Sequence, residues 1–147
     1  MLKGIPEIIS PALLKVLDEM GHGDRIVISD GNFPAESVGK DAIVIRADGH
    51  GVPEMLDAVL RLMPLDIYVE KPVKLMAVVP GDRTETPIWE DYRRIIGKYD
   101  RRGQETIENI ERFRFYDEAR QAYCIIATGE KALYANIMLQ KGVVTEE

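Results

Sequence analysis

The chain has 147 residues, of which 46% are hydrophobic and 30% charged, and these values are typical of one soluble globular domain with a sizeable core. The net charge is −6, and basic pairs such as Arg93-Arg94 are short and flanked by acids, which argues against a nucleic-acid-binding protein. No apolar run approaches the roughly 18 residues that span a bilayer, and the first residues lack the apolar stretch of a signal peptide. We therefore expect a cytoplasmic protein without a membrane segment.

The first half of the chain predicts two helices and two strands. Ser10 and Pro11 open a helix over residues 11–20, which carries leucines at helical spacing and stops at Gly21. An almost wholly apolar strand follows at residues 25–29, then a loop at 31–35 and a second strand at 42–45. Residues 52–63 form the next predicted helix, which Pro64 ends.

The second half continues the alternation. We predict a strand at residues 75–79, a helix at 88–99, a helix at 113–121, and strands at 123–128 and 134–140. Residues 101–109 are polar and fit a loop, a short strand or an oligomer contact. Several of these strands have no polar face, as in a sheet that helices cover on both sides. The predicted fold is a single three-layer α/β/α domain over residues 1–147, with a central, largely parallel or mixed sheet.

Two histidines are candidates for acid–base chemistry. His22 lies in a turn between Gly21 and Gly23, directly before the first strand, and an imidazole gains and loses protons near neutral pH. The alternative is an ordinary polar turn after a helix. His50 also lies between glycines, but a solvated loop histidine before a helix is the better explanation for it. A dinucleotide-binding loop is excluded because the glycines here follow a helix and precede a strand.

A metal site would need His22, Asp24 and Asp30 to converge, with His50 as a further donor. No tight spacing of histidine or cysteine supports such a site, so we predict no metal. Cys124 is the single cysteine and lies in an apolar run, which predicts a buried structural thiol and no intrachain disulfide.

Polar residues near the ends of predicted strands are candidates for ligand binding. Asp30 closes the first strand, where α/β proteins often bind ligands, although it could equally bond to its own loop backbone. Arg112 could form a surface salt bridge or hold a polyol through its fixed donors. Tyr134 and Asn136 would share one face of the last strand, because side chains there alternate with period two. The alternative is one buried tyrosine and one turn asparagine.

Several short motifs occur in one order along the chain. They are Gly21-His22-Gly23-Asp24, Asp30 with Asn32-Phe33-Pro34, Ile45-Arg46-Ala47-Asp48-Gly49, Gly81-Asp82, Glu111-Arg112-Phe113, Phe115-Tyr116, Thr128-Gly129-Glu130 and Tyr134-Ala135-Asn136-Ile137. In this order they resemble the L-fucose mutarotase and D-ribose pyranase family, over residues 2–144.

The resemblance implies an enzyme that interconverts the anomers or ring forms of a free monosaccharide without a cofactor. It implies that His22 is the proton donor and that the sugar is bound by Asp30, Arg112, Tyr134, Ala135 and Asn136. It also implies a homo-oligomer, commonly a decamer, with sites close to subunit contacts. Ring opening needs one proton removed from the anomeric hydroxyl and one added to the ring oxygen. Tyr134 or a bound water could serve as the base.

The sugar itself is less sharply indicated. Arg112-Phe113 and Phe115-Tyr116 resemble the fucose branch of the family, and Tyr134-Ala135-Asn136 resembles the ribose branch. We expect α- and β-L-fucose as the substrate, with D-ribose pyranase activity as the alternative. A non-catalytic sugar-binding oligomer, or a structural or regulatory oligomer without a sugar site, would also fit the composition.

Overall fold

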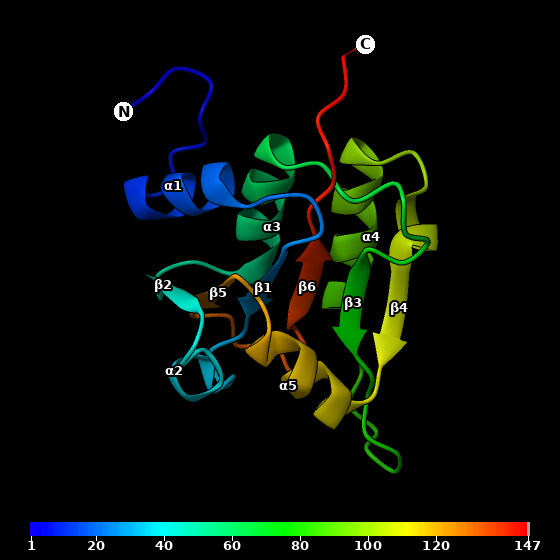
Figure 1. Ribbon diagram of the computed structural model, residues 1–147. Helices are drawn as coiled ribbons and strands as arrows, with labels where there is room; N and C mark the ends of the chain where they lie inside the picture. The colour runs from blue at the N-terminus through cyan, green and yellow to red at the C-terminus, as the bar shows by residue number, and fades with distance from the viewer. Residues whose placement is uncertain (147) are drawn as a thin grey trace.

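One six-stranded mixed sheet organises the computed structural model, which describes residues 1–146 (Figure 1). The strand order is β2-β5-β1-β6-β3-β4. Only β6 runs antiparallel to its neighbours, while β1, β2 and β5 pair in parallel, as do β3 and β4. The strands are β1 Arg25–Ser29, β2 Ile43–Ala47, β3 Val73–Met76, β4 Ile107–Ile110, β5 Cys124–Thr128 and β6 Ile137–Gln140.

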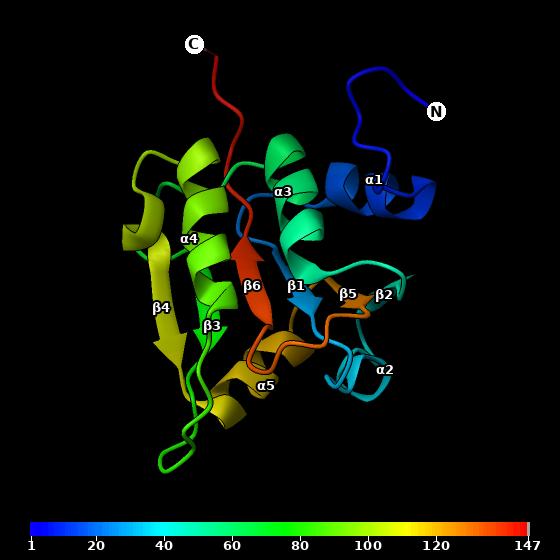
Figure 2. The ribbon, with the colours of Figure 1, turned by 180° about the vertical axis from the view of Figure 1, so that it is seen from behind.

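Helices cover both faces of this sheet, which confirms the predicted three-layer α/β/α fold. Figures 1 and 2 show α3 and α4 on one face and α5 on the other. The first face packs α1 Pro11–Glu19, α3 Val52–Leu62 and α4 Ile88–Tyr99; the second packs α2 Ala35–Val38 and α5 Arg112–Arg120. In β1, Ile26 and Ile28 join the first core and Val27 joins the second. Because alternate side chains enter opposite cores, the strand needs no polar residue.

The first helix begins as the sequence predicts. Ser10 Oγ accepts the backbone N–H of Leu13 at 3.2 Å, and Pro11 occupies the first helical position. The helix ends at Glu19, and the turn that follows places Gly23 at φ +88°, a left-handed conformation that glycine adopts without strain. The predicted turn around His22 is thus present.

Most predicted boundaries differ from the structure by one or two residues, and three differences matter for the site. The strand predicted at 75–79 is β3 at Val73–Met76, because β4 ends at Ile110, opposite Met76, and leaves no strand partner beyond. The last strand begins at Ile137 instead of 134, since the chain turns sharply at Tyr134, where φ is +55°. The predicted loop at 31–35 runs directly into the short helix α2. The ambiguous segment 101–109 contains the 3-10 helix η1, Gly103–Thr106, and the start of β4, so the strand alternative is correct for residues 107–109 only.

An ion-pair cluster ties α5 to the sheet. Glu118 Oε1 accepts from Arg25 Nη1 at 3.0 Å and from Lys74 Nζ at 2.9 Å, which joins the helix to β1 and β3. Burial acts to raise the pKa of Glu118, but these cations outweigh it and hold the pKa below its ordinary value. The helix that carries Arg112 is therefore anchored to the two strands beneath it.

Two further features bear on the predictions from composition. Cys124 is fully buried in β5, and burial raises the pKa of its thiol to about 12, as befits a structural cysteine. Within residues 1–146, no helix has the length and apolar character needed to cross a membrane.

Candidate functional site

A cavity of about 250 Å³ opens beyond the C-terminal end of β1. Four of the six residues predicted for the site line it: Asp30, Arg112, Tyr134 and Asn136. The cavity is somewhat smaller than the roughly 300–1,000 Å³ of pockets for drug-sized ligands, so it suits a smaller molecule. The remaining lining residues are Asn32, Phe33, Met76, Val79, Asp82, Tyr116 and Leu133.

Asp30 serves both roles that the sequence left open. Its Oδ1 accepts the backbone N–H groups of Asn32 at 3.0 Å and Phe33 at 2.9 Å, so the carboxylate shapes the loop after β1. The same side chain is buried and lines the cavity. Burial raises the pKa of Asp30, against the lowering effect of the backbone N–H groups of Asn32, Phe33 and Ala135. A fixed carboxyl group of this kind is available to accept from a hydroxyl of a bound molecule.

The segment Tyr134-Ala135-Asn136 is held by hydrogen bonds from two elements. Trp89 Nε1 donates to the carbonyl of Tyr134 at 2.8 Å, and the Tyr92 hydroxyl donates to the carbonyl of Ala135 at 2.6 Å. Asn136 Oδ1 accepts the backbone N–H of Asp30 at 2.7 Å. The left-handed turn at Tyr134 costs energy for a non-glycine residue, and these bonds from α4 and from Asp30, directly after β1, hold it in place.

Ala135 does not line the cavity, because its side chain is fully buried against the core and its carbonyl accepts from Tyr92. Tyr134 and Asn136 both reach the cavity, as predicted, but through the turn before β6 and not through strand alternation. The alternative of one buried tyrosine fails because the Tyr134 hydroxyl bonds at the cavity, to Asp82 and Val79.

Arg112 is the first residue of α5, and its cation rests on aromatic rings. The guanidinium carbon lies 5.6 Å from the ring centre of Phe113 and 5.7 Å from that of Tyr116. Glu111 caps the helix by accepting the backbone N–H groups of Phe113 and Arg114. The stacking positions Arg112 at the cavity wall, where its N–H donors can bind hydroxyl oxygens.

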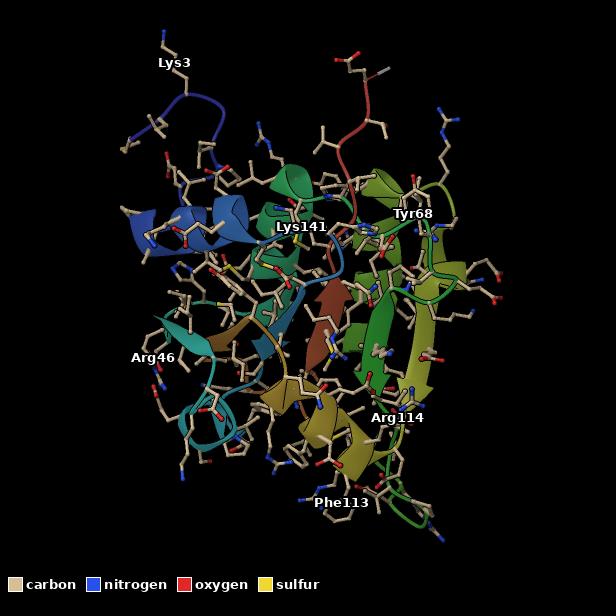
Figure 3. The ribbon with its side chains drawn as sticks, viewed as in Figure 1. Lys3, Arg46, Tyr68, Phe113, Arg114 and Lys141 are labelled. Atoms are coloured by element: carbon tan, nitrogen blue, oxygen red, sulfur yellow. The ribbon has the colours of Figure 1, made fainter. Side chains whose placement is uncertain are left out.

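His22 lies at the other end of β1 and does not line this cavity. The five strand residues between the two ends span about 16 Å at roughly 3.3 Å each. Figure 3 shows the same separation: Tyr68, which packs 5.4 Å from the His22 ring, lies at one end of the sheet, and Phe113 beside Arg112 lies at the other. A single chain therefore does not bring the predicted proton donor to the predicted binding residues.

The surroundings of His22 are nevertheless specific. Its Nε2 lies 3.1 Å from Oδ2 of Asp66, whose side chain is 2% exposed whereas the His22 side chain is 45% exposed. Gln140 Nε2 donates to the same oxygen at 2.9 Å, and the backbone N–H of Tyr68 donates to Oδ1 at 2.9 Å. Burial acts to raise the pKa of Asp66, but these donors and His22 outweigh it and lower the pKa. Since an ionised carboxylate only accepts, Nε2 carries the hydrogen and Nδ1 is left to exchange protons.

His50 has a weaker environment. Its Nδ1 lies 3.1 Å from Oε1 of Glu54 on the surface, and that carboxylate also caps α3 by accepting the N–H of Gly51. The reading as a loop histidine before a helix fits these contacts. Among residues 1–146, no group of three histidine, cysteine or acidic side chains is placed to hold a metal ion.

Sequence reasoning gave no role to four residues that build these sites. Asp66 lies in a stretch without periodicity, so nothing marked it as the partner of His22. Trp89 and Tyr92 lie in the predicted helix 88–99 and are buried in the core, and their polar atoms also fix residues 134 and 135. Asp82 was noted within the motif series, and the structure adds that its Oδ2 accepts from the Tyr134 hydroxyl at 2.6 Å.

The cavity combines two kinds of wall. Carboxyl, guanidinium, phenol and amide groups converge from the loop after β1, the start of α5 and the turn before β6. Phe33 stacks on Tyr116 at 5.5 Å and 24°, and Met76 and Leu133 add further apolar surface. Such an arrangement is suited to a small molecule with several hydroxyls and one apolar part.

Comparisons with known proteins find relatives over nearly the whole chain. Residues 3–144 match the RbsD / FucU transport protein family. The chain is 48% identical to the fucose mutarotase of Mus musculus, over 97% of this chain and 95% of that protein. The crystal structure of FucU from Bifidobacterium longum is 62% identical, with a TM-score of 0.96 over 97% of this chain and all of the other. The fucose mutarotase of Streptococcus pneumoniae, solved in complex with L-fucose, is 49% identical, with a TM-score of 0.91 over 98% and 100%.

Proposed function

The chain belongs to the RbsD/FucU family, and on this premise we propose that it is a sugar mutarotase, an isomerase that interconverts the α and β anomers of free L-fucose. The observation that carries the proposal is the convergence of Asp30, Arg112, Tyr134 and Asn136 on one cavity of monosaccharide size. Relatives named fucose mutarotase match over nearly the whole chain, so the same site is expected to serve the same chemistry.

The mixed wall of the cavity favours L-fucose over D-ribose. Fucose is a deoxy sugar with a methyl group at one end and hydroxyls around the rest of its ring. Phe33, Met76 and Leu133 offer apolar contact for such a methyl, while the polar residues face the hydroxyls. D-ribose lacks the methyl group, and burying a methyl is worth on the order of 1 kcal/mol. D-ribose is therefore the weaker alternative substrate.

The chemistry requires proton transfers only. A base removes the proton of the anomeric hydroxyl, an acid protonates the ring oxygen, and the ring bond breaks to give the open aldehyde. Rotation about the first carbon–carbon bond and closure with the reverse transfers give the other anomer. Such general acid–base catalysis typically contributes about 10²–10⁴-fold. His22, held by the buried Asp66 carboxylate, is the proposed acid.

Because His22 and the cavity occupy opposite ends of β1, the proposed acid must come from a second subunit. Both ends carry exposed apolar side chains suited to such a contact. Ile67 and Tyr68 are 60% and 71% exposed near His22, and Phe113 and Leu133 are 67% and 53% exposed around the cavity. A head-to-tail contact between these two surfaces forms a ring where the rotation between neighbouring subunits closes. We propose a cytoplasmic ring-forming homo-oligomer, with a decamer expected; light scattering that gives a monomer mass at micromolar protein would contradict it.

Magnetisation-transfer NMR between the anomers of L-fucose tests the proposed function. The parent protein should speed exchange above the slow uncatalysed rate, and more for L-fucose than for D-ribose at equal enzyme. His22→Ala should cut exchange about 10²-fold or more while sugar binding survives better. Its stability should change little, because Gln140 and Tyr68 still donate to Asp66.

The matched control is His50→Ala, which removes the other histidine and its surface carboxylate contact. This variant should exchange anomers at the parent rate. A folded, assembled His22→Ala variant with the parent rate would refute the role of His22. A protein that binds L-fucose without speeding exchange would be a sugar-binding protein instead of an enzyme.

A further inference from the structure

The loop between β3 and α4 carries a carboxylate whose position is fixed at the cavity. This loop projects beyond the end of β3 (Figure 2). Asp82 lines the cavity, and its Oδ1 accepts the backbone N–H of Thr84 at 2.9 Å and the Thr84 hydroxyl at 2.6 Å. A turn with Gly81 at φ +88° brings the Asp82 N–H to the carbonyl of Val79 at 3.0 Å. One oxygen of Asp82 is thus used to hold the loop.

The other oxygen of Asp82 bonds to the tyrosine of the site. The Tyr134 hydroxyl donates to Asp82 Oδ2 at 2.6 Å, and the backbone N–H of Val79 donates to the same hydroxyl oxygen at 3.3 Å. The phenol proton is therefore committed to the carboxylate. A hydroxyl oxygen has two lone pairs, so after the Val79 contact one is left to accept from a bound sugar. The Tyr134 hydroxyl can therefore accept a hydrogen bond from a molecule in the cavity, as a base must.

The charges of Asp82 and Tyr134 favour the same direction of the hydrogen bond between them. The hydrogen bonds from Thr84 and Tyr134 hold the pKa of Asp82 below its ordinary value. The bond to Asp82 raises the pKa of Tyr134 in turn. The pair is a carboxylate and a neutral phenol at neutral pH, as the direction of the hydrogen bond requires.

We propose that Asp82 is a positioning residue that makes Tyr134 the base of the reaction, and this inference rests on the proposed mutarotase function. The anomeric hydroxyl gives its proton to Tyr134 Oη as the phenol proton moves to Asp82 Oδ2. The bond between the anomeric carbon and the ring oxygen breaks, and its electron pair goes to the ring oxygen. That oxygen takes the Nδ1 proton of the partner subunit's His22, which acts as the imidazolium and is left neutral with its Nε2 hydrogen still donated to Asp66. Ring closure reverses each transfer and restores Tyr134, Asp82 and His22.

The backbone of Tyr134 supports this arrangement. Its left-handed conformation, with φ +55°, is held by Trp89 and turns the side chain toward the loop that carries Asp82. Strained backbone of this kind costs of order 1–3 kcal/mol and persists where surrounding contacts hold it. Both partners of the pair are thus fixed from opposite sides, one by α4 and the other by its own turn.

A double-mutant cycle in the exchange assay tests the coupling. Asp82→Asn should lower kcat for L-fucose about 10–100-fold and change KM less than about threefold, because the loss falls on proton transfer and not on binding. The acidic limb of the kcat–pH profile that reports the carboxylate should disappear. Tyr134→Phe should cost at least as much. Adding Asp82→Asn to Tyr134→Phe should cost less than about twofold more, since the two residues act as one unit.

Two controls separate this role from a structural one. Asp57→Asn changes another exposed aspartate that accepts from a tyrosine hydroxyl, that of Tyr99 at 3.1 Å, and should keep the parent rate. Thr84→Ala removes a hydrogen bond that holds the loop but leaves the Asp82–Tyr134 bond, and should cost less than about threefold. If Thr84→Ala loses as much as Asp82→Asn, Asp82 acts only on the loop.

A spectroscopic measurement keeps the test independent of turnover. The pKa of Tyr134, from ultraviolet difference titration of the parent against Tyr134→Phe, should fall in Asp82→Asn. An unchanged pKa of Tyr134 in Asp82→Asn overturns the inference. So does an Asp82→Asn variant that keeps the kcat of the parent, or a double variant whose loss of kcat equals the product of the two single losses. A parent protein that does not speed exchange overturns the proposed function along with it. An active parent with an insensitive Asp82→Asn variant overturns only the role of Asp82.

Discussion

Mixing two inactive variants would show whether a site is shared between subunits. One variant is His22→Ala, which keeps an intact cavity. The other is Asp30→Asn, which keeps His22 but loses the cavity carboxylate. Burial raises the pKa of Asp30, so the neutral amide is expected to be tolerated by the fold. Each variant alone should have less than about 1% of the parent exchange rate.

The expected recovery follows from the position of His22. About 16 Å of strand separates it from the cavity of its own chain. If each site joins a cavity from one subunit to a histidine from the next, random assembly of the two variants in equal amounts restores about one quarter of the sites. If His22 served its own chain, no site would be restored.

The assay is anomer exchange of L-fucose with purified oligomers from cells that express both chains equally. Co-expression of the parent with the double variant His22→Ala/Asp30→Asn is the matched control. For shared sites this control also gives about one quarter of the parent rate, whereas sites within one chain would give about one half. A mixture of the single variants that remains inactive, beside a control near one half, would refute the shared site.

Three further substitutions test the supporting contacts. Asp66→Asn should lower kcat about tenfold or more, because the fixed carboxylate orients His22, and kcat against pH will check it. Tyr92→Phe should lower the free energy of unfolding in urea by about 1–3 kcal/mol, because the buried carbonyl of Ala135 loses its donor. Glu118→Gln should cost about 1–2 kcal/mol at pH 7, since the carboxylate is less than one fifth exposed. Because the folded-state pKa of Glu118 is lowered, the difference in free energy of unfolding between the parent and Glu118→Gln is complete above pH 4.5, the ordinary pKa of the group. The difference is lost as the pH falls through the folded-state pKa.

The sequence predicted the layers of the fold better than the ends of its strands. Apolar strands without a polar face predicted the covered sheet, because Val27 packs against one core and its neighbours against the other. The extent of a strand depends on its partners, however, and β3 is displaced because β4 and β6 leave its predicted end unpaired. No local pattern carries that information, since the partners lie more than 30 residues away.

The site residues also differ in whether the local sequence identifies them. Asp30, with a turn of Gly, Asn and Pro after a buried strand, has a local signature, and the structure places it in the cavity. Asp66 has none, because its role as the partner of His22 exists only once residues 22, 66 and 140 are brought together. Tyr134 reached the cavity for a reason other than the predicted one: a strained turn replaced strand alternation.

The direction of one strand explains why the site forms where it does. Because β6 is antiparallel to β1, its first residue, Ile137, pairs with Ile28 near the end of β1. The turn that carries Tyr134 and Asn136 therefore meets Asp30 at one edge of the sheet. The far end of β6 carries Gln140, which pairs with Arg25 and donates to Asp66 beside His22. A parallel β6 would have exchanged these ends, so the binding residues and the carboxylate that holds the proposed acid both depend on this one reversal.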